Sequence, residues 1–341
     1  MEAIKILSVT KCGDLFPYGE EEIKSKYKEL VKEWHPDTND SPEAPNAFAK
    51  ITELYDKALE LLENGQWEKT NYILISKDNG KKIEINYDTC FEFELGTCYV
   101  TKTKIVYLLG KDKEKYYNNA IQRMGSLQYK DKRMEDDLSR FLPKVYQTFR
   151  TKNGEYAIVL DKTEDVYPLK DVFEYFGEKI NDRHVAWIIS RLCNLTCYFE
   201  FSGLVHNGIH LNNCFVSPQN HSILLLGGWW YTTGKDEKMI GTTKDIFSIM
   251  SVSAKESKKS STVTDLESVK LLGRQLLGEI NSRKLSLDRS VPKPFIAFLT
   301  GGSGRNAYEE FTKWDKALED SYGKRKFIQM KIKNLYKRKG D

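Results

Sequence analysis

Two segments with helical periodicity flank the tripeptide His35-Pro36-Asp37, and together they constrain the start of this chain to a helical hairpin. The first segment begins near Glu20 and repeats its large side chains on one face, at Ile23, Tyr27, Leu30, Val31 and Trp34. The second repeats the same stripe at Phe48, Ile51, Tyr55, Leu59 and Leu62, and Gly65 ends it. Because Pro36 cannot extend the first helix and moves His35 out of the α region, we expect an exposed, polar loop between the two helices.

Residues 1–63 resemble the J domain of DnaJ-type co-chaperones, whose signature is a lysine-rich helix, an HPD loop and an antiparallel helix with a Phe and Tyr stripe. We therefore expect a J domain at residues 1–65. The resemblance implies docking on a DnaK-type chaperone ATPase, with the loop stimulating ATP hydrolysis and the lysines facing an acidic surface. The implied binding residues are His35, Pro36 and Asp37 of the loop and Lys24, Lys28 and Lys32 of the preceding helix. An ordinary helix-loop-helix with a chance tripeptide is the alternative.

Length and charge set wide bounds on the rest. The 341 residues are enough for two domains with a core each. A net charge of +4, from 53 basic and 49 acidic residues, does not by itself call for a nucleic-acid partner. There is no apolar run long enough to span a membrane and no export signal, so we expect no membrane partner. Six scattered cysteines without paired CxxC spacing signal neither a zinc site nor a disulfide framework, and they favour free thiols in a reducing cytoplasm. We expect no cofactor and no metal site.

From Tyr72 the apolar period changes from helical to two, which predicts strands. Residues 72–75 and 82–85 flank Asn79-Gly80, a pair suited to a tight turn. We expect these two strands to form one antiparallel sheet of about five strands together with strands at 91–95, 98–102 and 105–109. A polar helix at 113–124 and two more strands, at 145–150 and 156–160, are expected to follow.

The part that follows is predicted to be mainly helical. A long apolar stripe predicts a helix at 182–201, with Gly203 as its cap. The stretch from Ser251 to Thr262 is rich in Ser, Lys and Thr and is expected to be a mobile loop. Further helices are expected at 264–278, 294–299, 307–318 and 327–337.

This order of elements is similar to that of a protein kinase over about residues 72–325. His206 and Asn213 have the spacing of the kinase catalytic loop, H-R-D-L-x-x-x-N, while Asp265 resembles the buried aspartate that braces this loop. Arg305 resembles the arginine near the end of the kinase lobe. The implied fold class is α+β, a helical J-domain hairpin followed by a two-lobed kinase-like fold. Its expected parts are an N-lobe at 72–160, a C-lobe at 161–325 and a basic tail at 326–341.

Most groups needed for phosphoryl transfer are missing from this pattern. Gly208 stands at the position of the catalytic base, and no carboxylate lies between Ile223 and Gly234, where a metal-binding aspartate belongs. The phosphate loop has only Gly96, and the strand at 105–109 has no lysine. We therefore predict a pseudokinase, and not an enzyme. The degenerate loop consists of His206, Gly208, Asn213 and Asp265. An atypical kinase that recruits Asp236 or Glu237 is the alternative.

A narrower resemblance is to bacterial and phage proteins in which a short J domain precedes a degenerate kinase-like domain. It rests on Arg183-His184-Val185-Ala186-Trp187, Val205-His206, Pro218-Gln219-Asn220-His221, Trp314-Asp315, Tyr322-Gly323 and Arg325-Lys326-Phe327. It favours a cytoplasmic adaptor that brings an unidentified protein client to a DnaK-type chaperone. A second hypothesis is an atypical protein kinase whose J domain recruits chaperone-bound substrates. The basic tail leaves nucleic-acid binding open, although a solvated basic helix is the commoner case.

Overall fold

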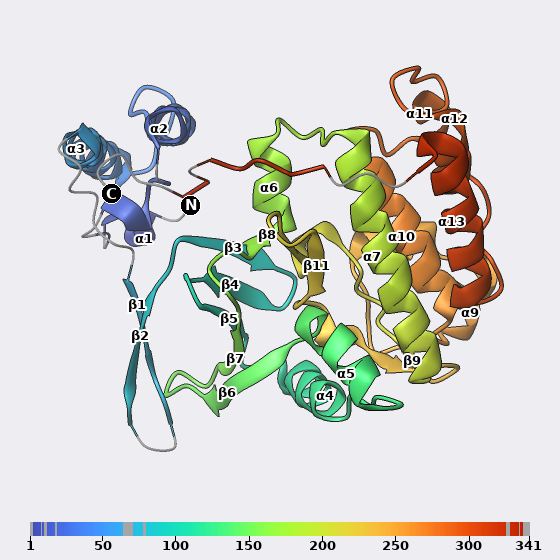
Figure 1. Cartoon of the computed structure of the whole chain (residues 1–341). Helices are drawn as coiled ribbons and strands as arrows, with labels where there is room; N and C mark the ends of the chain where they lie inside the picture. The colour runs from blue at the N-terminus through green and yellow to red at the C-terminus, as the bar shows by residue number, and fades with distance from the viewer. Residues whose placement is uncertain are drawn as a thin grey trace. The chain divides into compact units, whose positions relative to one another are not determined.

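The computed structural model shown in Figure 1 describes residues 3–7, 9, 12–17, 19–63, 71–77, 80–324, 328–333 and 335–336. These residues fall into two compact units. One is built mainly on residues 1–74 and 82–89, and the other on residues 75–81 and 90–335. Within the described residues, no helix is both long and apolar enough to cross a membrane.

The first unit confirms the predicted helical hairpin. Its elements are α1 (Ala3–Leu7), the 3-10 helix η1 (Cys12–Asp14), α2 (Glu20–Trp34) and α3 (Ala44–Glu63). On α2 the buried residues Ile23, Leu30 and Trp34 belong to the predicted stripe. On α3 the predicted face was wrong in part, because its buried residues are Ala44, Ala47, Ile51, Leu54 and Ala58. Small alanine side chains let the two helices approach closely, and the larger residues of the predicted stripe flank that line.

The first two strands of the chain correct the prediction of a single antiparallel sheet. β1 (Asn71–Ile75) and β2 (Lys82–Asn86) pair with each other, as expected, but they form a two-stranded sheet of their own. The larger sheet has the order β3-β4-β5-β7-β6 and is built from β3 (Thr89–Phe93), β4 (Gly96–Val100), β5 (Lys104–Leu109), β6 (Lys144–Arg150) and β7 (Tyr156–Asp161). Its five strands therefore come from later residues than the sequence pattern suggested.

One helix, α4 (Glu114–Gly125), lies between β5 and β6 in the chain, and α5 (Lys132–Leu138) and η2 (Ser139–Phe141) follow it. The pairs β4/β5, β5/β7 and β6/β7 are all antiparallel. β5 is the central strand, and its residues Ile105 to Leu109 are all buried. This part of the chain therefore has a small antiparallel sheet with one principal helix, while β2 and most of β1, which the expected N-lobe at 72–160 included, belong to the first unit.

The larger part of the second unit is helical. Its main helices are α6 (Leu169–Tyr175), α7 (Asp182–Phe201), α10 (Thr262–Leu276), α12 (Lys293–Thr300) and α13 (Ala307–Tyr322). Short α8 (Lys244–Ile249), α9 (Val252–Ser257) and α11 (Ser282–Leu285) connect them. In Figure 1, α7, α10 and α13 lie side by side, with α7 packed against both of the others. α7 has the bounds that the apolar stripe predicted.

Short strands and 3-10 turns, one just before α6 and the others between α7 and α8, form the loops of this lobe. They are β8 (Tyr167–Pro168), β9 (Leu204–Val205), η3 (Leu211–Asn213), β10 (Cys214–Ser217), β11 (Ser222–Leu225), η4 (Trp229–Tyr231) and β12 (Thr233–Gly234). β11, β10 and β8 make one small sheet, while β12 pairs with β9. These pairings bring the segment around His206 against the segment that follows β11.

Two predictions about the second unit were wrong. The stretch expected to be a mobile loop contains α9, because the Ser251 hydroxyl caps the helix by accepting a hydrogen bond from the Ala254 N–H at 3.2 Å. The helix expected at 327–337 is absent from the described residues 328–333. Met330 in this extended stretch is only 2% exposed and belongs to the core of the lobe, so burial of that side chain replaces helix formation.

Candidate functional site

The loop between α2 and α3 presents His35 and Asp37 at its surface. The Asp37 N–H donates to His35 Nδ1 at 3.2 Å, and the His35 ring meets the edge of the Phe48 ring, with 5.2 Å between centroids. The side chain of His35 is 40% exposed and that of Asp37 is 84% exposed. The backbone N–H of Asn39 donates to the His35 carbonyl, which fixes the turn after Pro36. The Asp37 carboxylate lies 3.7 Å from His35 Nδ1, and both groups are offered to solvent.

The charge of α2 differs from what the lysine pattern suggested. The helix has four lysines but also five glutamates, so its net charge is −1. Lys24 pairs with Glu20 at 2.6 Å, and this hydrogen bond raises the pKa of Lys24 above its ordinary value. Lys28 and Lys32 are exposed, and no ion pair to either forms within the part of the chain that the structure describes. The positive charge available to a partner is therefore concentrated on Lys28 and Lys32.

In the second unit, Asp265 braces the loop that begins at His206. Its carboxylate oxygens accept hydrogen bonds from the backbone N–H groups of His206 at 2.7 Å and Asn207 at 2.8 Å. Asp265 is only 1% exposed, and burial raises its pKa to about 7 although both hydrogen bonds oppose the shift. The His206 ring is fully buried, which lowers its pKa to about 3 and keeps it neutral. Asn207 adopts a left-handed conformation with φ of 57°.

Gly208 and Asn213 lie together a few residues later. The Asn213 side-chain amide donates to the Gly208 carbonyl at 2.9 Å, and the Gly227 N–H donates to the Asn213 carbonyl at 3.0 Å. Asn213 is 5% exposed. The amide that the kinase resemblance assigns to a metal thus holds the backbone of its own loop.

Three glycines allow two backbone segments to touch where kinase carboxylates would stand. A Cβ atom on Gly208 would lie 3.1 Å from Gly228 Cα. One on Gly227 would lie 2.7 Å from both Asn213 Oδ1 and the Tyr107 hydroxyl oxygen, and one on Gly228 would lie 2.6 Å from His206 Cε1. The contacts at positions 227 and 228 would force the neighbouring side chains to shift, and the contact at position 208 is tighter than ordinary packing. An aspartate at position 208 or 227 would therefore displace its neighbours.

Aromatic rings fill the adjoining space beneath the sheet. Phe93 on β3, Tyr107 on β5 and Trp230 in η4 form a closed triangle, with centroid separations of 4.7 Å between Phe93 and Trp230, 5.0 Å between Tyr107 and Trp230, and 5.6 Å between Phe93 and Tyr107. Tyr107 and Trp230 are almost fully buried, and burial raises the pKa of Tyr107 well above its ordinary value. The space between β3, β5 and η4 is therefore filled by aromatic rings.

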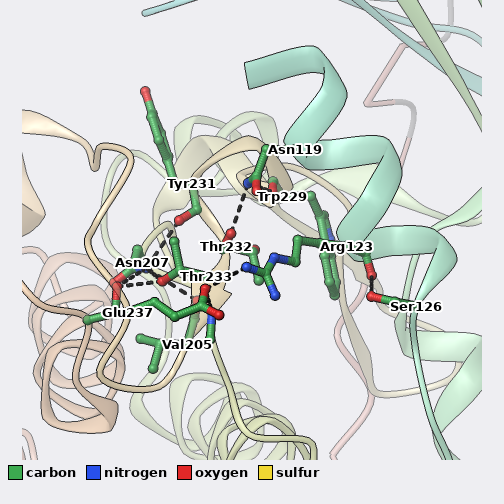
Figure 2. Close-up of polar contacts among 12 residues, drawn as sticks. Asn119, Arg123, Ser126, Val205, Asn207, Trp229, Tyr231, Thr232, Thr233 and Glu237 are labelled. Atoms are coloured by element: carbon green, nitrogen blue, oxygen red, sulfur yellow. Dashed lines mark hydrogen bonds and ion pairs between the residues drawn. The ribbon is translucent and has the colours of Figure 1, made fainter. Parts of the chain in front are cut away.

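Figure 2 shows how α4 is joined to the chain after β11. The buried side-chain amide of Asn119 donates to the Trp230 carbonyl at 3.2 Å and to the Thr232 carbonyl at 2.8 Å. One turn later, Arg123 binds the Glu237 carboxylate at 2.6 Å. Glu237 also accepts from the Gly234 N–H at 2.7 Å. The helix and the segment after the glycines are thus fastened together by amide and guanidinium contacts.

The sequence pattern did not single out Tyr107 or Asn119. The signal for them was present but indirect. The strand at 105–109 has no lysine and the helix after it has no suitable glutamate, so the residues that do face the site from those elements, Tyr107 and Asn119, were the ones to inspect. Among the described residues, no group of three or more His, Cys, Asp or Glu side chains could hold a metal ion.

Arg305 does not have the role that the kinase resemblance suggested. Its side chain is 93% exposed and contacts Glu309. The buried ion pair of this lobe joins Lys270 and Glu310 at 2.9 Å, with both side chains 2% exposed. Lys270 also donates to the Gly301 carbonyl, and Glu310 accepts from the Gly304 N–H. The buried Lys270, and not Arg305, therefore joins α10 to α13.

Comparison with known proteins identifies the two parts. The DnaJ domain family model matches residues 5–63. DnaJ homolog subfamily C member 16 of Mus musculus is 36% identical over 81 residues, which are 21% of this chain and 10% of that protein. The Homo sapiens protein of the same name is 35% identical over 78 residues, 20% of this chain and 9% of that protein. The chain therefore spans about a tenth of the length of these curated relatives.

The second part is similar to the solved structure of vaccinia related kinase 3. The TM-score is 0.52 at 14% sequence identity, and the likeness covers 74% of this chain and 92% of that one. At this level of identity the comparison establishes the fold. The chain thus consists of a DnaJ domain, matched at residues 5–63, followed by a domain with the fold of a protein kinase.

Proposed function

We propose that this protein is a J-domain co-chaperone that stimulates the ATPase of a DnaK-type chaperone. The observation that carries the proposal is the loop between α2 and α3, in which His35 is held by Phe48 and by the Asp37 N–H while the Asp37 carboxylate is 84% exposed. A pre-ordered polar loop loses little conformational freedom on docking. Lys28 and Lys32 supply the charge that would steer the encounter with an acidic surface.

We further propose that the kinase-like domain transfers no phosphate and binds a protein client or partner. Three observations support this. Side chains at Gly208, Gly227 and Gly228 would crowd their neighbours, and aromatic rings occupy the space beside these glycines. Asn213 donates its amide to a backbone carbonyl. Catalysis would then belong to the chaperone, and this chain would deliver a client to it. The proposed location is the cytoplasm.

The atypical-kinase alternative has no comparable support. It requires Asp236 or Glu237 to bind a metal-nucleotide complex, yet Glu237 is already bonded to Arg123 and to the Gly234 N–H. The basic tail offers little support for nucleic-acid binding, since the described stretch from Ile328 to Lys333 includes the buried Met330.

The decisive experiment is single-turnover ATP hydrolysis by a purified DnaK-type chaperone, with and without this protein. We expect stimulation that is lost with His35→Gln, because the variant removes the imidazole from the loop without disturbing a buried group. His210→Gln is the matched control, since His210 lies in the kinase-like domain and contacts Asp245. Equal stimulation by wild type and His35→Gln would refute the co-chaperone proposal.

A further inference from the structure

One face of α7 carries polar and aromatic side chains that lie outside the degenerate loop. Arg183, Trp187, Arg191 and Asn194 recur at i, i+4, i+8 and i+11, so they lie along one side of the helix. Arg183 and Arg191 are exposed, and Trp187 and Asn194 are half-buried. Two cavities open along this face.

The first cavity has a volume of about 220 Å³ and lies between α7 and α13, with Trp187, Trp314 and Tyr322 among its walls. The second has a volume of about 570 Å³ and lies between α7 and the segment of α5 and η2. Arg191 and Asn194 line both cavities, so the two cavities are neighbours that share these residues. We call the two cavities, with the shared residues, the α7 groove.

The aromatic walls of the first cavity are held in place. Trp314 Nε1 donates to the Ser190 hydroxyl at 2.8 Å, and the Tyr322 hydroxyl donates to Asp182 at 2.7 Å. The Trp187 ring stacks on the His221 ring with centroids 4.8 Å apart and an angle of 4° between planes. Rings fixed in this way form a cavity that exists before a ligand arrives, which reduces the entropic cost of binding.

The charge of the α7 groove is strongly biased. Its basic side chains are Lys130, Arg140, Arg183, Arg191 and Lys324, and its acidic side chains are Asp137 and Asp315. Five positive and two negative charges leave a net charge of +3. All five basic residues are exposed. Two of them are held within the lobe, since Arg191 Nε donates to the His221 carbonyl at 3.2 Å and the Arg183 guanidinium lies 5.0 Å from the Tyr322 ring centroid. Arginine forks are suited to binding carboxylates, and tryptophan, tyrosine and arginine are the residues that dominate protein interfaces.

We propose that the α7 groove binds an extended acidic segment of a partner protein, with one apolar side chain in the first cavity and carboxylates at Arg191 and its basic neighbours. The first cavity is smaller than the roughly 300–1,000 Å³ of pockets for small molecules, and it suits a single side chain. Phe201 and Tyr308, 45% and 52% exposed, border the second cavity and extend the contact surface. This inference rests on the proposed function, because it names the surface and the class of partner of the kinase-like domain.

The test begins with an unbiased display library of random peptides selected on the full chain. We expect recovered peptides to be enriched in Asp and Glu around an aromatic or aliphatic residue. Fluorescence anisotropy with one such labelled peptide should show at least tenfold weaker binding for Arg191→Glu and for Lys324→Glu. Arg305→Glu, the same kind of charge reversal at an exposed site outside the groove, should bind like wild type. Thermal melting confirms that each variant is folded.

Three results would overturn the inference. They are the recovery of no acidic consensus, equal binding by Arg191→Glu and wild type, and a preference of the groove for an oligonucleotide over the peptide. Two cross-tests separate this inference from the co-chaperone proposal. Arg191→Glu should still stimulate the chaperone ATPase without peptide, and His35→Gln should still bind the peptide. If the wild type stimulates the chaperone ATPase but binds no acidic peptide, the groove inference fails and the co-chaperone proposal stands.

Discussion

The hydroxyl oxygen of Tyr107 lies 2.7 Å from the point where a Cβ atom on Gly227 would stand. The two residues come from different lobes, the central strand of the sheet and the segment after β11. In a kinase the corresponding space would hold a lysine and a metal-bound aspartate, separated by a nucleotide. Here a buried tyrosine hydroxyl faces a glycine that has no side chain to meet it.

This contact makes Gly227→Ala destabilising. The added methyl group would overlap the Tyr107 hydroxyl and the Asn213 side chain, both of which are buried, and we expect a loss of about 1 to 3 kcal/mol in the free energy of unfolding. Urea denaturation measures the effect. Gly302→Ala is the matched control, because a Cβ at position 302 meets nothing within 4 Å.

We also expect magnesium-ATP to leave the melting temperature of the wild type unchanged. A rise in melting temperature that depends on nucleotide concentration would show that the kinase-like domain binds the nucleotide.

The two classes of lysine on α2 lead to a second prediction. Lys28→Ala should raise the concentration of this protein needed for half-maximal stimulation of a DnaK-type ATPase, because Lys28 is exposed and available to an acidic partner. Lys24→Ala should have a smaller effect, since Glu20 already neutralises that charge. Lys57→Ala on the exposed surface of α3 controls for net charge. The difference between Lys28→Ala and Lys24→Ala should shrink as salt is raised. Equal effects of the two variants at low salt would refute the idea that Lys28 is more available to an acidic partner than Lys24.

A third prediction concerns Asn119. Asn119→Ala would leave the Trp230 and Thr232 carbonyls without their donor in a buried setting, which costs about 1 to 3 kcal/mol of stability. Asn118→Ala, at the neighbouring position on the same helix, provides a control with the same change in helix propensity. Hydrogen exchange should also show faster opening of residues 229–234 in Asn119→Ala. Unchanged exchange there would mean that α4 does not hold this segment.

The fold was largely predictable because its strongest signals are local. Helical periodicity located α2 and α7, and the position of Pro36 located the loop that presents His35. Pairing of β1 and β2 followed from their short connection. Their separation from the larger sheet did not, because strand partners are chosen by register and packing between distant residues. The line of alanines on α3 was missed for a similar reason, since a small residue becomes a core position only when another helix packs on it.

The candidate site in the kinase-like domain was only half predictable. Missing carboxylates can be read from the sequence, and Gly208 and the stretch around Gly227 showed that they are missing. What fills the space cannot be read in the same way. Trp230 reaches Phe93 and Tyr107 across the lobe boundary, and Lys270 meets Glu310 across two helices. Both contacts join residues far apart in the chain, and neither has a fixed spacing that a motif could record.

The buried pair of titrating groups behind the loop gives a prediction on pH. The pKa of His206 is about 3 in the folded protein, against about 6.5 in an unfolded chain. Between these values the unfolded state binds more protons, so the stabilising contribution is fully present above about pH 6.5 and is lost as the pH falls toward 3. Asp265 acts in the opposite direction. Its folded pKa of about 7 exceeds the unfolded value, so stability from this group falls as the pH rises from about 4 to about 7.

Because these two groups oppose each other, the wild type alone would show a weak pH dependence, and a variant is needed to separate them. His206→Leu removes one titration and leaves the backbone N–H that Asp265 accepts. As the pH falls from about 6 to about 4, the free energy of unfolding of the wild type should decrease relative to that of His206→Leu by up to about 1.4 kcal/mol per pH unit. Urea denaturation of both proteins at several pH values measures this difference. Parallel stability curves would show that His206 is protonated in the folded protein, which a fully buried ring between Phe199 and Trp229 should not permit.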